Sequence, residues 1–316
     1  MGSYARPSPL PASAVQKLMD SLATALSILY QFGTNGAFLL LSALGLIVIL
    51  GMMNIINLAH GELMMLGAYS ATTAVQHGLP FPVAVLVAFV IVGLFGAVLE
   101  RIVVRRFYGR ELGALVVTWG ISLILSQGSL LLFGPFMPSI QIPGGFLRAG
   151  HYSFSVYWLS LIATCIVVVV ALWWLYNRTS FGLQARATMQ NAAMARALGV
   201  DTARIYTLTF SLGAGLAGFS GALLAPTTSI MPFMGQQFVA PAFITVVVGG
   251  AANVIAGAVG SSILLSVVRT PVGFLFGSFL GLVALLLAAL IIIRLMPDGI
   301  SAWLQKHLDN RARMRS

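Results

Sequence analysis

A succession of long apolar segments constrains this chain more than any other feature of its sequence. A helix needs about 20 apolar residues to cross a bilayer, and only helices and closed barrels satisfy their backbone groups there. Apolar residues make up 59% of the 316 residues and charged residues 8%, against about 25% charged residues in a typical soluble domain. We therefore predict an all-α, polytopic membrane protein with about 8–10 transmembrane segments. The apolar segments lie at 18–33, 36–53, 61–77, 80–99, 112–133, 157–177, 206–225, 239–268 and 272–296.

Two of these segments depart from a simple crossing. The segment at 18–33 is short and carries Asp20 and Gln31, so it could lie along the membrane interface. The segment at 239–268 is too long for one crossing and contains the glycine-rich run 249–253. We predict two short helices there, separated by a break of the broken or re-entrant kind.

Basic residues are concentrated in three regions between or after the segments. The chain carries 17 Lys and Arg against 7 Asp and Glu, a net charge of +10. In a membrane protein this excess belongs to cytoplasmic loops rather than to a nucleic-acid surface, so 101–110, 178–204 and 306–315 are predicted to be cytoplasmic. An even number of crossings must then separate the second region from the third. Only a split of 239–268 gives an even number, which supports the break independently.

We expect a single transmembrane domain at 18–300 with short ends. Residues 1–17 are rich in Pro, Ser and Ala and lack the apolar core of a signal peptide, so they are predicted to be a flexible tail. The polar connection at 178–205 is assigned to the cytoplasm, and 301–316 is predicted to be a basic cytoplasmic tail. The single cysteine, Cys165, lies in an apolar segment and offers no disulfide or cysteine-based metal site within the chain.

Polar side chains interrupt the apolar sequence between the second and third segments. They are Asn54, Asn57, His60 and Glu62, with Gly61 between the last two. Such groups are costly in lipid and commonly mark a solute pathway. Glu62 could contact a substrate, or it could stabilise the start of the helix that follows. His60 has no second ligand at metal-binding spacing, so no metal site is predicted.

The two halves of the chain share a faint internal symmetry. Residues 51–56 read GMMNII and residues 250–255 read GAANVI. Interrupted hydrophobic segments at corresponding places in two halves point to a transport site, which adds Gly250 and Asn253 to the candidate pathway. We expect side-chain amides and broken-helix backbone there to give a small neutral solute brief hydrogen bonds. A chance match among 33 glycines is the alternative.

The 178–205 connection is rich in alanine, with Arg186 and Arg196 within it and Gly199 as a helix stop. This pattern predicts one or two short cytoplasmic helices whose small residues let a partner dock closely. A solvated connector is the alternative.

Enzymatic chemistry is not expected. The chain has two lysines, Lys17 and Lys306, neither of which follows a glycine, so it contains no phosphate-binding Gly-x-x-x-x-Gly-Lys loop. No Gly-x-Ser-x-Gly sequence of a serine hydrolase occurs. No catalytic residue and no bound cofactor are predicted, and any ATP must be used by partner subunits.

Four stretches, 54–69, 100–125, 182–204 and 243–257, resemble the permeases of ABC importers of the branched-chain amino acid and urea type, and the match covers most of the chain. The resemblance implies an inverted-repeat helical fold in the bacterial inner membrane. It also implies a second homologous permease forming a heterodimer, two cytoplasmic ATPase subunits and a periplasmic substrate-binding protein. It further implies that 182–204 holds the coupling helix that docks on an ATPase. The residues assigned to this coupling are Gly182, Arg186, Asn191, Ala192, Ala193, Arg196 and Gly199.

The segments 63–69, 108–110 and 118–120 look more like the urea-type branch. The predicted function is therefore a permease subunit of an ATP-driven importer of a small polar solute, with urea or a short amide favoured over a branched-chain amino acid. The alternative is an ion-coupled secondary carrier, in which Glu62 would be the coupling carboxylate.

Overall fold

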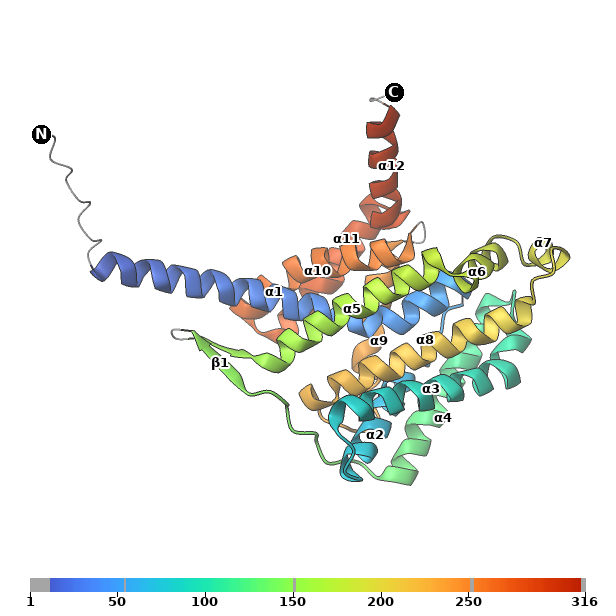
Figure 1. Ribbon diagram of the computed structural model, residues 1–316, viewed down its shortest axis with the longest axis horizontal. Helices are drawn as coiled ribbons and strands as arrows, with labels where there is room; N and C mark the ends of the chain where they lie inside the picture. Colours follow the sequence, from blue (N-terminus) through green and yellow to red (C-terminus); the bar gives the residue numbers. More distant parts are fainter. Residues whose placement is uncertain (1–11, 54, 150–151, 251–252, 314–316) are drawn as a thin grey trace, which may run out of the picture.

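The computed structural model describes residues 12–53, 55–149, 152–250 and 253–313, and nearly all of its regular structure is helical (Figure 1). Two strands, β1 (Phe146–Ala149) and β2 (Tyr152–Ser155), form an antiparallel hairpin. Short 3₁₀ turns, η1 (Val104–Phe107) and η2 (Ala225–Thr227), follow the third and eighth helices. The helices are α1 (Ala12–Met53), α2 (His60–Gln76), α3 (Phe81–Ile102), α4 (Glu111–Phe133), α5 (Val156–Arg178), α6 (Ser180–Gln190), α7 (Ala192–Ala197), α8 (Thr202–Leu224), α9 (Gln236–Gly249), α10 (Val254–Phe276), α11 (Ser278–Leu295) and α12 (Gly299–Arg313).

Seven of the described helices are long and apolar enough to cross a membrane: α1, α3, α4, α5, α8, α10 and α11. This confirms the predicted all-α, polytopic class. Helices α2 and α9 are shorter, with 17 and 14 residues. At about 1.5 Å per residue, α9 covers roughly 21 Å, less than the hydrocarbon core of about 30 Å. Helix α9 is therefore too short to span the membrane alone.

The structure corrects the expected start of the bundle. Residues 18–33 and 36–53 belong to one continuous helix, α1, of 42 residues. The glycines near the expected gap serve packing: a Cβ added to Gly36 would lie 3.6 Å from Ser266 Oγ of α10. Small residues of this kind let membrane helices approach closely. Residues 12–17, expected in the flexible tail, are helical as well, and the rest of that tail lies outside the described residues.

The centre of the bundle consists of α1, α2 and α8, packed almost backbone to backbone. Gly67 of α2 faces Gly218 of α8, and Gly45 of α1 faces Gly213 of α8; a Cβ added to Gly67 or to Gly45 would collide with the facing backbone. Helix α3 packs along α8 in the same layer (Figure 1). By contrast, α4, α5, α10 and α11 expose many large apolar side chains, as surfaces that contact lipid or another subunit do.

The predicted break within 239–268 is confirmed, because α9 ends at Gly249 and α10 begins at Val254. Four helices, α8 to α11, follow the 178–205 connection. Three of them are long enough to cross a membrane, so the even number expected from charge requires that the short helix α9 and the break after it complete a fourth crossing, and this stays a prediction. The last boundary is corrected: α10 continues through 269–271, and the chain turns at Gly277, whose φ of 91° favours glycine.

The predicted C-terminal tail is mostly helical. Helix α12 projects away from the bundle (Figure 1). Its first residue packs on the break between α9 and α10, since a Cβ added to Gly299 would lie 2.7 Å from the amide nitrogen of Gly250. Both glycines have positive φ angles, 78° and 81°, which an ordinary side chain would strain. Residues 314–316 lie outside the described part.

Candidate functional site

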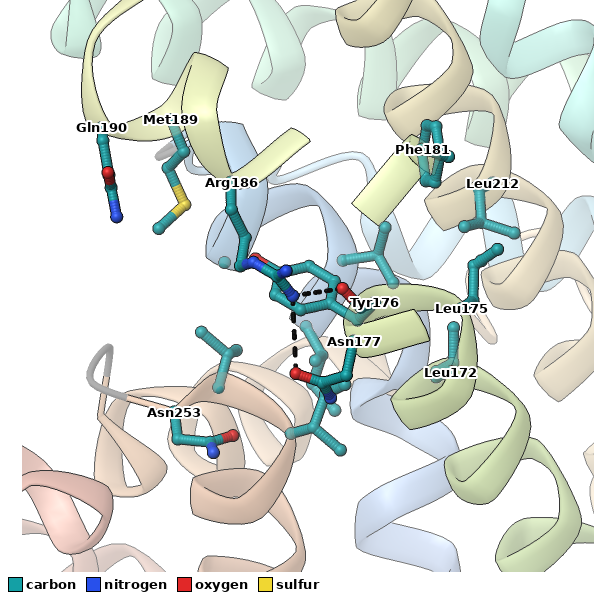
Figure 2. Close-up of a pocket in the computed structure, with 15 residues that line it drawn as sticks. Leu172, Leu175, Tyr176, Asn177, Phe181, Arg186, Met189, Gln190, Leu212 and Asn253 are labelled. Carbon is teal, nitrogen blue, oxygen red and sulfur yellow. Dashed lines mark hydrogen bonds between the residues drawn. The ribbon is translucent and has the colours of Figure 1, made fainter. Parts of the chain in front are cut away.

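A cavity of about 300 Å³ lies among α1, α5, α6, α8 and α10. It is found where the break before α10 meets the turn from α5 into α6 (Figure 2). Apolar side chains form much of the wall, and a few polar groups converge on it. A mostly apolar cavity of this size with few polar groups is typical of small-molecule sites. The polar lining residues are Tyr176, Asn177, Arg186, Gln190 and Asn253.

The cavity brings the two glycine–asparagine sequences together. Gly51 from the first and Asn253 from the second both line it. A Cβ added to Gly51 would lie 2.7 Å from Val254 Cγ1, so the end of α1 packs against the start of α10. Asn54 lies outside the described residues. The two similar sequences therefore also lie close together in space, and their role in transport stays a prediction.

Asn253 begins α10 as its N-cap. Its Oδ1 accepts a hydrogen bond from the Ala256 N–H at 3.1 Å, which satisfies one of the free amides of the first helical turn. The side chain is exposed to the cavity. Gly250, the other predicted pathway residue of this break, does not line the cavity and instead contacts the start of α12.

Arg186 connects the cavity to the connection predicted to couple with an ATPase. Its Nη1 donates to the carbonyl oxygen of Tyr176 and to Asn177 Oδ1, the latter at 3.4 Å (Figure 2). Its Cζ lies 5.5 Å from the centre of the Tyr176 ring, a cation–π contact. These contacts hold α6 against the end of α5, so a displacement of α6 would act directly on the cavity wall.

The connection folds into two short helices, as predicted, because polar caps divide it. Thr179 caps α6, and Asn191 caps α7 by accepting from the Met194 N–H at 2.9 Å. Gly199 ends α7 with a φ of 87°. Gly182 packs against the carbonyl groups at the end of α5. Residues Ala193 and Arg196 are exposed, and Ala192 is half-buried.

This pair of helices presents apolar side chains to the outside. They are far more exposed than core residues of the same type, and they belong to a segment predicted to face the cytoplasm. Exposed apolar groups of this kind mark interaction surfaces. The members of this apolar surface are Leu183, Met194 and Leu198, whereas Met189 of α6 lines the cavity (Figure 2).

The polar residues around the first break are buried away from the cavity. Asn57 and His60 are fully buried, and Glu62 is 1% exposed. Asn57 Oδ1 accepts from the Ala59 N–H at 3.1 Å, and His60 Nε2 lies 2.7 Å from the carbonyl oxygen of Ser42. Gly61 packs against the backbone of Gly235. These groups therefore fix the loop before α2 against neighbouring elements.

Glu62 lies in the first turn of α2, where the helix dipole favours a negative charge. Its Oε1 accepts a hydrogen bond from Ser126 Oγ of α4 at 3.4 Å. Glu62 Oε2, Asn57 Nδ2 and His60 Nδ1 are buried without a hydrogen-bond partner among the described residues. Within that same part of the chain, no three His, Cys, Asp or Glu side chains are grouped to hold a metal ion.

One buried ionic cluster was not predicted. Glu100, fully buried at the end of α3, accepts from Arg105 Nε at 3.0 Å, from the Tyr108 hydroxyl at 2.5 Å and from Thr207 Oγ1 of α8 at 2.7 Å. Burial and the hydrogen bond to Glu100 raise the pKa of Tyr108 above its usual range. The cluster fixes η1 to α3 and α8. The run of basic residues that follows Glu100 in the sequence could have indicated an ion pair at this place.

Arg269 was also not predicted as a candidate functional residue. The predicted segments placed it in a connection, between 239–268 and 272–296, whereas the structure places it inside the membrane-spanning helix α10. A lone charge within an apolar helix is a recognised sign of function, and a correct helix boundary would have revealed it.

Comparison with known proteins relates this chain to the permeases of branched-chain amino acid transport systems. Residues 27–295 match a family model described as the permease component of the branched-chain amino acid transport system. The chain is 30% identical over 286 residues to the high-affinity branched-chain amino acid permease protein BraD of Pseudomonas aeruginosa, covering 84% of this chain and 92% of BraD. It is 27% identical to the corresponding protein LivH of Escherichia coli K12, with the same coverage. A probable LivH of Methanocaldococcus jannaschii is 27% identical over 72% of this chain and 74% of its own length. No solved structure matches.

Proposed function

Because this chain belongs to the family of permease components of branched-chain amino acid transport systems, we propose that it is the transmembrane subunit of an ATP-driven importer of branched-chain amino acids. It is a multi-pass protein of the inner membrane. The observation that carries the proposal is the cavity, where Asn253 of the α9–α10 break and Arg186 of α6 line one space. A partner that moves α6 would thereby change the shape of a solute site.

The proposed substrate class differs from the one favoured by short motifs. The segments 63–69, 108–110 and 118–120 suggested urea or a short amide. Those motifs are only a few residues long, whereas the relatives named for branched-chain amino acid transport match along 84% of the chain. We therefore give branched-chain amino acids precedence over urea.

In the proposed mechanism, a separate ATPase docks on the apolar surface of α6 and α7. Arg186 transmits its movement to Tyr176 and Asn177 of α5, and the cavity widens or closes beside Asn253. ATP is hydrolysed on the partner chains. A complete importer of this design contains two such ATPases, a second homologous permease and a periplasmic binding protein.

The test is reconstitution in proteoliposomes with the partner subunits. We expect ATP-dependent uptake of L-leucine that requires the binding protein, and little uptake of urea under the same conditions. Uptake of urea in preference to leucine would overturn the proposed substrate class. Uptake by this chain alone, driven by an ion gradient without ATPase subunits, would instead support the secondary-carrier alternative.

A further inference from the structure

Arg269 is a cation inside a membrane-spanning helix, and it has no acidic partner within the described chain. The one ion pair found between described residues joins Arg105 to Glu100. Arg269 Nη1 is buried, and no group in the described part accepts a hydrogen bond from it. An arginine in a membrane helix is costly unless its charge is compensated. The described residues therefore supply no compensating anion for this charge.

The guanidinium is directed into the bundle rather than toward the membrane surface. Arg269 Cζ lies 5.0 Å from the centre of the Phe38 ring of α1. The Phe38 ring in turn packs 5.8 Å from that of Phe238 of α9, which is 1% exposed. Arg269 is also seven residues before the end of α10 at Phe276, or about 10 Å along the helix axis. A lipid phosphate lies at the surface, and an arginine that bound one would extend toward it.

The register of α9 and α10 places Arg269 beside the start of α9. The two helices are antiparallel: Gly249 packs against Gly257, and Ser261 Oγ donates to the carbonyl oxygen of Thr245 at 2.5 Å. Each residue forward along α10 therefore corresponds to one residue backward along α9. Eight residues beyond Ser261, Arg269 is level with Gln237, in the first turn of α9.

The first turn of a helix carries a partial positive charge. The start of α9 and the guanidinium of Arg269 thus add their positive potentials at the same level in the membrane. Short helices that begin within a transporter commonly direct this end at an anionic group of the substrate. The aromatic ring of Phe38 adjoins the guanidinium and offers an apolar surface next to it, and the buried ring of Phe238 supports Phe38 from behind.

We propose that Arg269 binds the carboxylate of the transported amino acid during its passage across the membrane. This inference rests on the proposed function and adds to it a carboxylate-binding group. A guanidinium can donate two parallel hydrogen bonds to a carboxylate, and the neighbouring Phe38 ring suits an aliphatic side chain. Urea has no carboxylate and gains nothing from this site.

The test compares Arg269→Gln and Arg269→Lys with the control Arg294→Gln, which removes an exposed arginine at the end of α11. Each variant is assembled with its partner subunits and assayed for subunit composition, basal ATPase activity and ATP-driven uptake of L-leucine. Equilibrium binding of L-leucine is measured in nanodiscs without the binding protein. L-Leucinamide, which lacks the carboxylate, serves as competitor.

We expect Arg269→Gln to assemble with its partner subunits but to bind and take up leucine roughly 10- to 100-fold less well. It should also lose the preference for leucine over leucinamide, which a purely structural role would not change. Arg269→Lys should be intermediate because it keeps the charge but not the paired donors. Arg294→Gln should behave as wild type.

Two results would overturn the inference. One is an unchanged preference for leucine in Arg269→Gln, or in Arg269→Lys if the glutamine variant does not fold. The other is selective loss of the second permease from Arg269→Gln, which would assign the anion to an acidic residue of that subunit. If the wild-type complex takes up no leucine, the proposed function itself fails; if it takes up leucine and one of these two results is found, only the role of Arg269 fails.

Discussion

At the scale of single residues, the polar groups of the two breaks have different surroundings although their sequences are alike. Asn253 is exposed to the cavity, whereas Asn57 and Glu62 are enclosed. The difference arises because α4 covers the first break, with Ser126 bonded to Glu62. The motif could be found in the sequence, but its burial depends on a helix more than sixty residues away and could not be predicted from it.

Replacing Asn253 by Leu should reduce leucine uptake several-fold. The change removes both an amide from the cavity and the cap of α10, which contributes about 1 kcal/mol. Asn253→Ser is the control, because its hydroxyl can still cap the helix. Uptake in proteoliposomes and the melting temperature of the complex separate the two effects. Normal uptake by Asn253→Leu would show that the cavity is not on the solute path.

At the scale of elements, the apolar segments predicted most helices well because a bilayer fixes the length of a crossing. The predicted helix boundaries were wrong at positions where contact with a neighbouring helix determines whether the helix continues. Gly33 and Gly36 looked like a boundary but lie inside α1, and residues 269–271 looked like a loop but lie inside α10. Glycine or proline in lipid can serve contact with a neighbouring helix, and the sequence does not distinguish this use from a helix end.

Gly67→Ala should destabilise the protein by about 1–3 kcal/mol or prevent its folding, because the added methyl group would collide with the backbone of Gly218. Gly120→Ala in α4 is the matched control, since nothing lies within 4 Å of the added Cβ and alanine favours the helix. The measurement is thermal unfolding of the purified variants. Equal melting temperatures would contradict the close α2–α8 packing.

Leu198→Glu should weaken binding of the ATPase roughly fivefold or more, the loss expected when a central apolar contact is removed. The side chain is 78% exposed at the end of α7, so the change should not affect folding of this chain. Leu198→Met should preserve binding. Co-purification of the ATPase with each variant provides the measurement, and equal recovery with Glu and Met would place the docking surface elsewhere.

At the scale of the whole molecule, the distribution of charge predicts the orientation in the membrane. Cysteine introduced at Ala193, which is exposed, should react with a membrane-impermeant maleimide only from the cytoplasmic side. The native Cys165 is 3% exposed and is replaced by alanine in the background. Labelling in intact cells before permeabilisation would reverse the proposed topology and with it the ATPase docking face.

The glycine contacts at the centre of the bundle limit which parts of the molecule can slide past one another. Where backbones interlock, as at Gly45 with Gly213 and Gly67 with Gly218, a small axial shift would drive a neighbouring side chain into the opposite helix. Helices α1, α2 and α8 should therefore move together as one rigid body during a transport cycle. The movements that open and close the path are therefore expected in α5 and α6, whose junction lines the cavity.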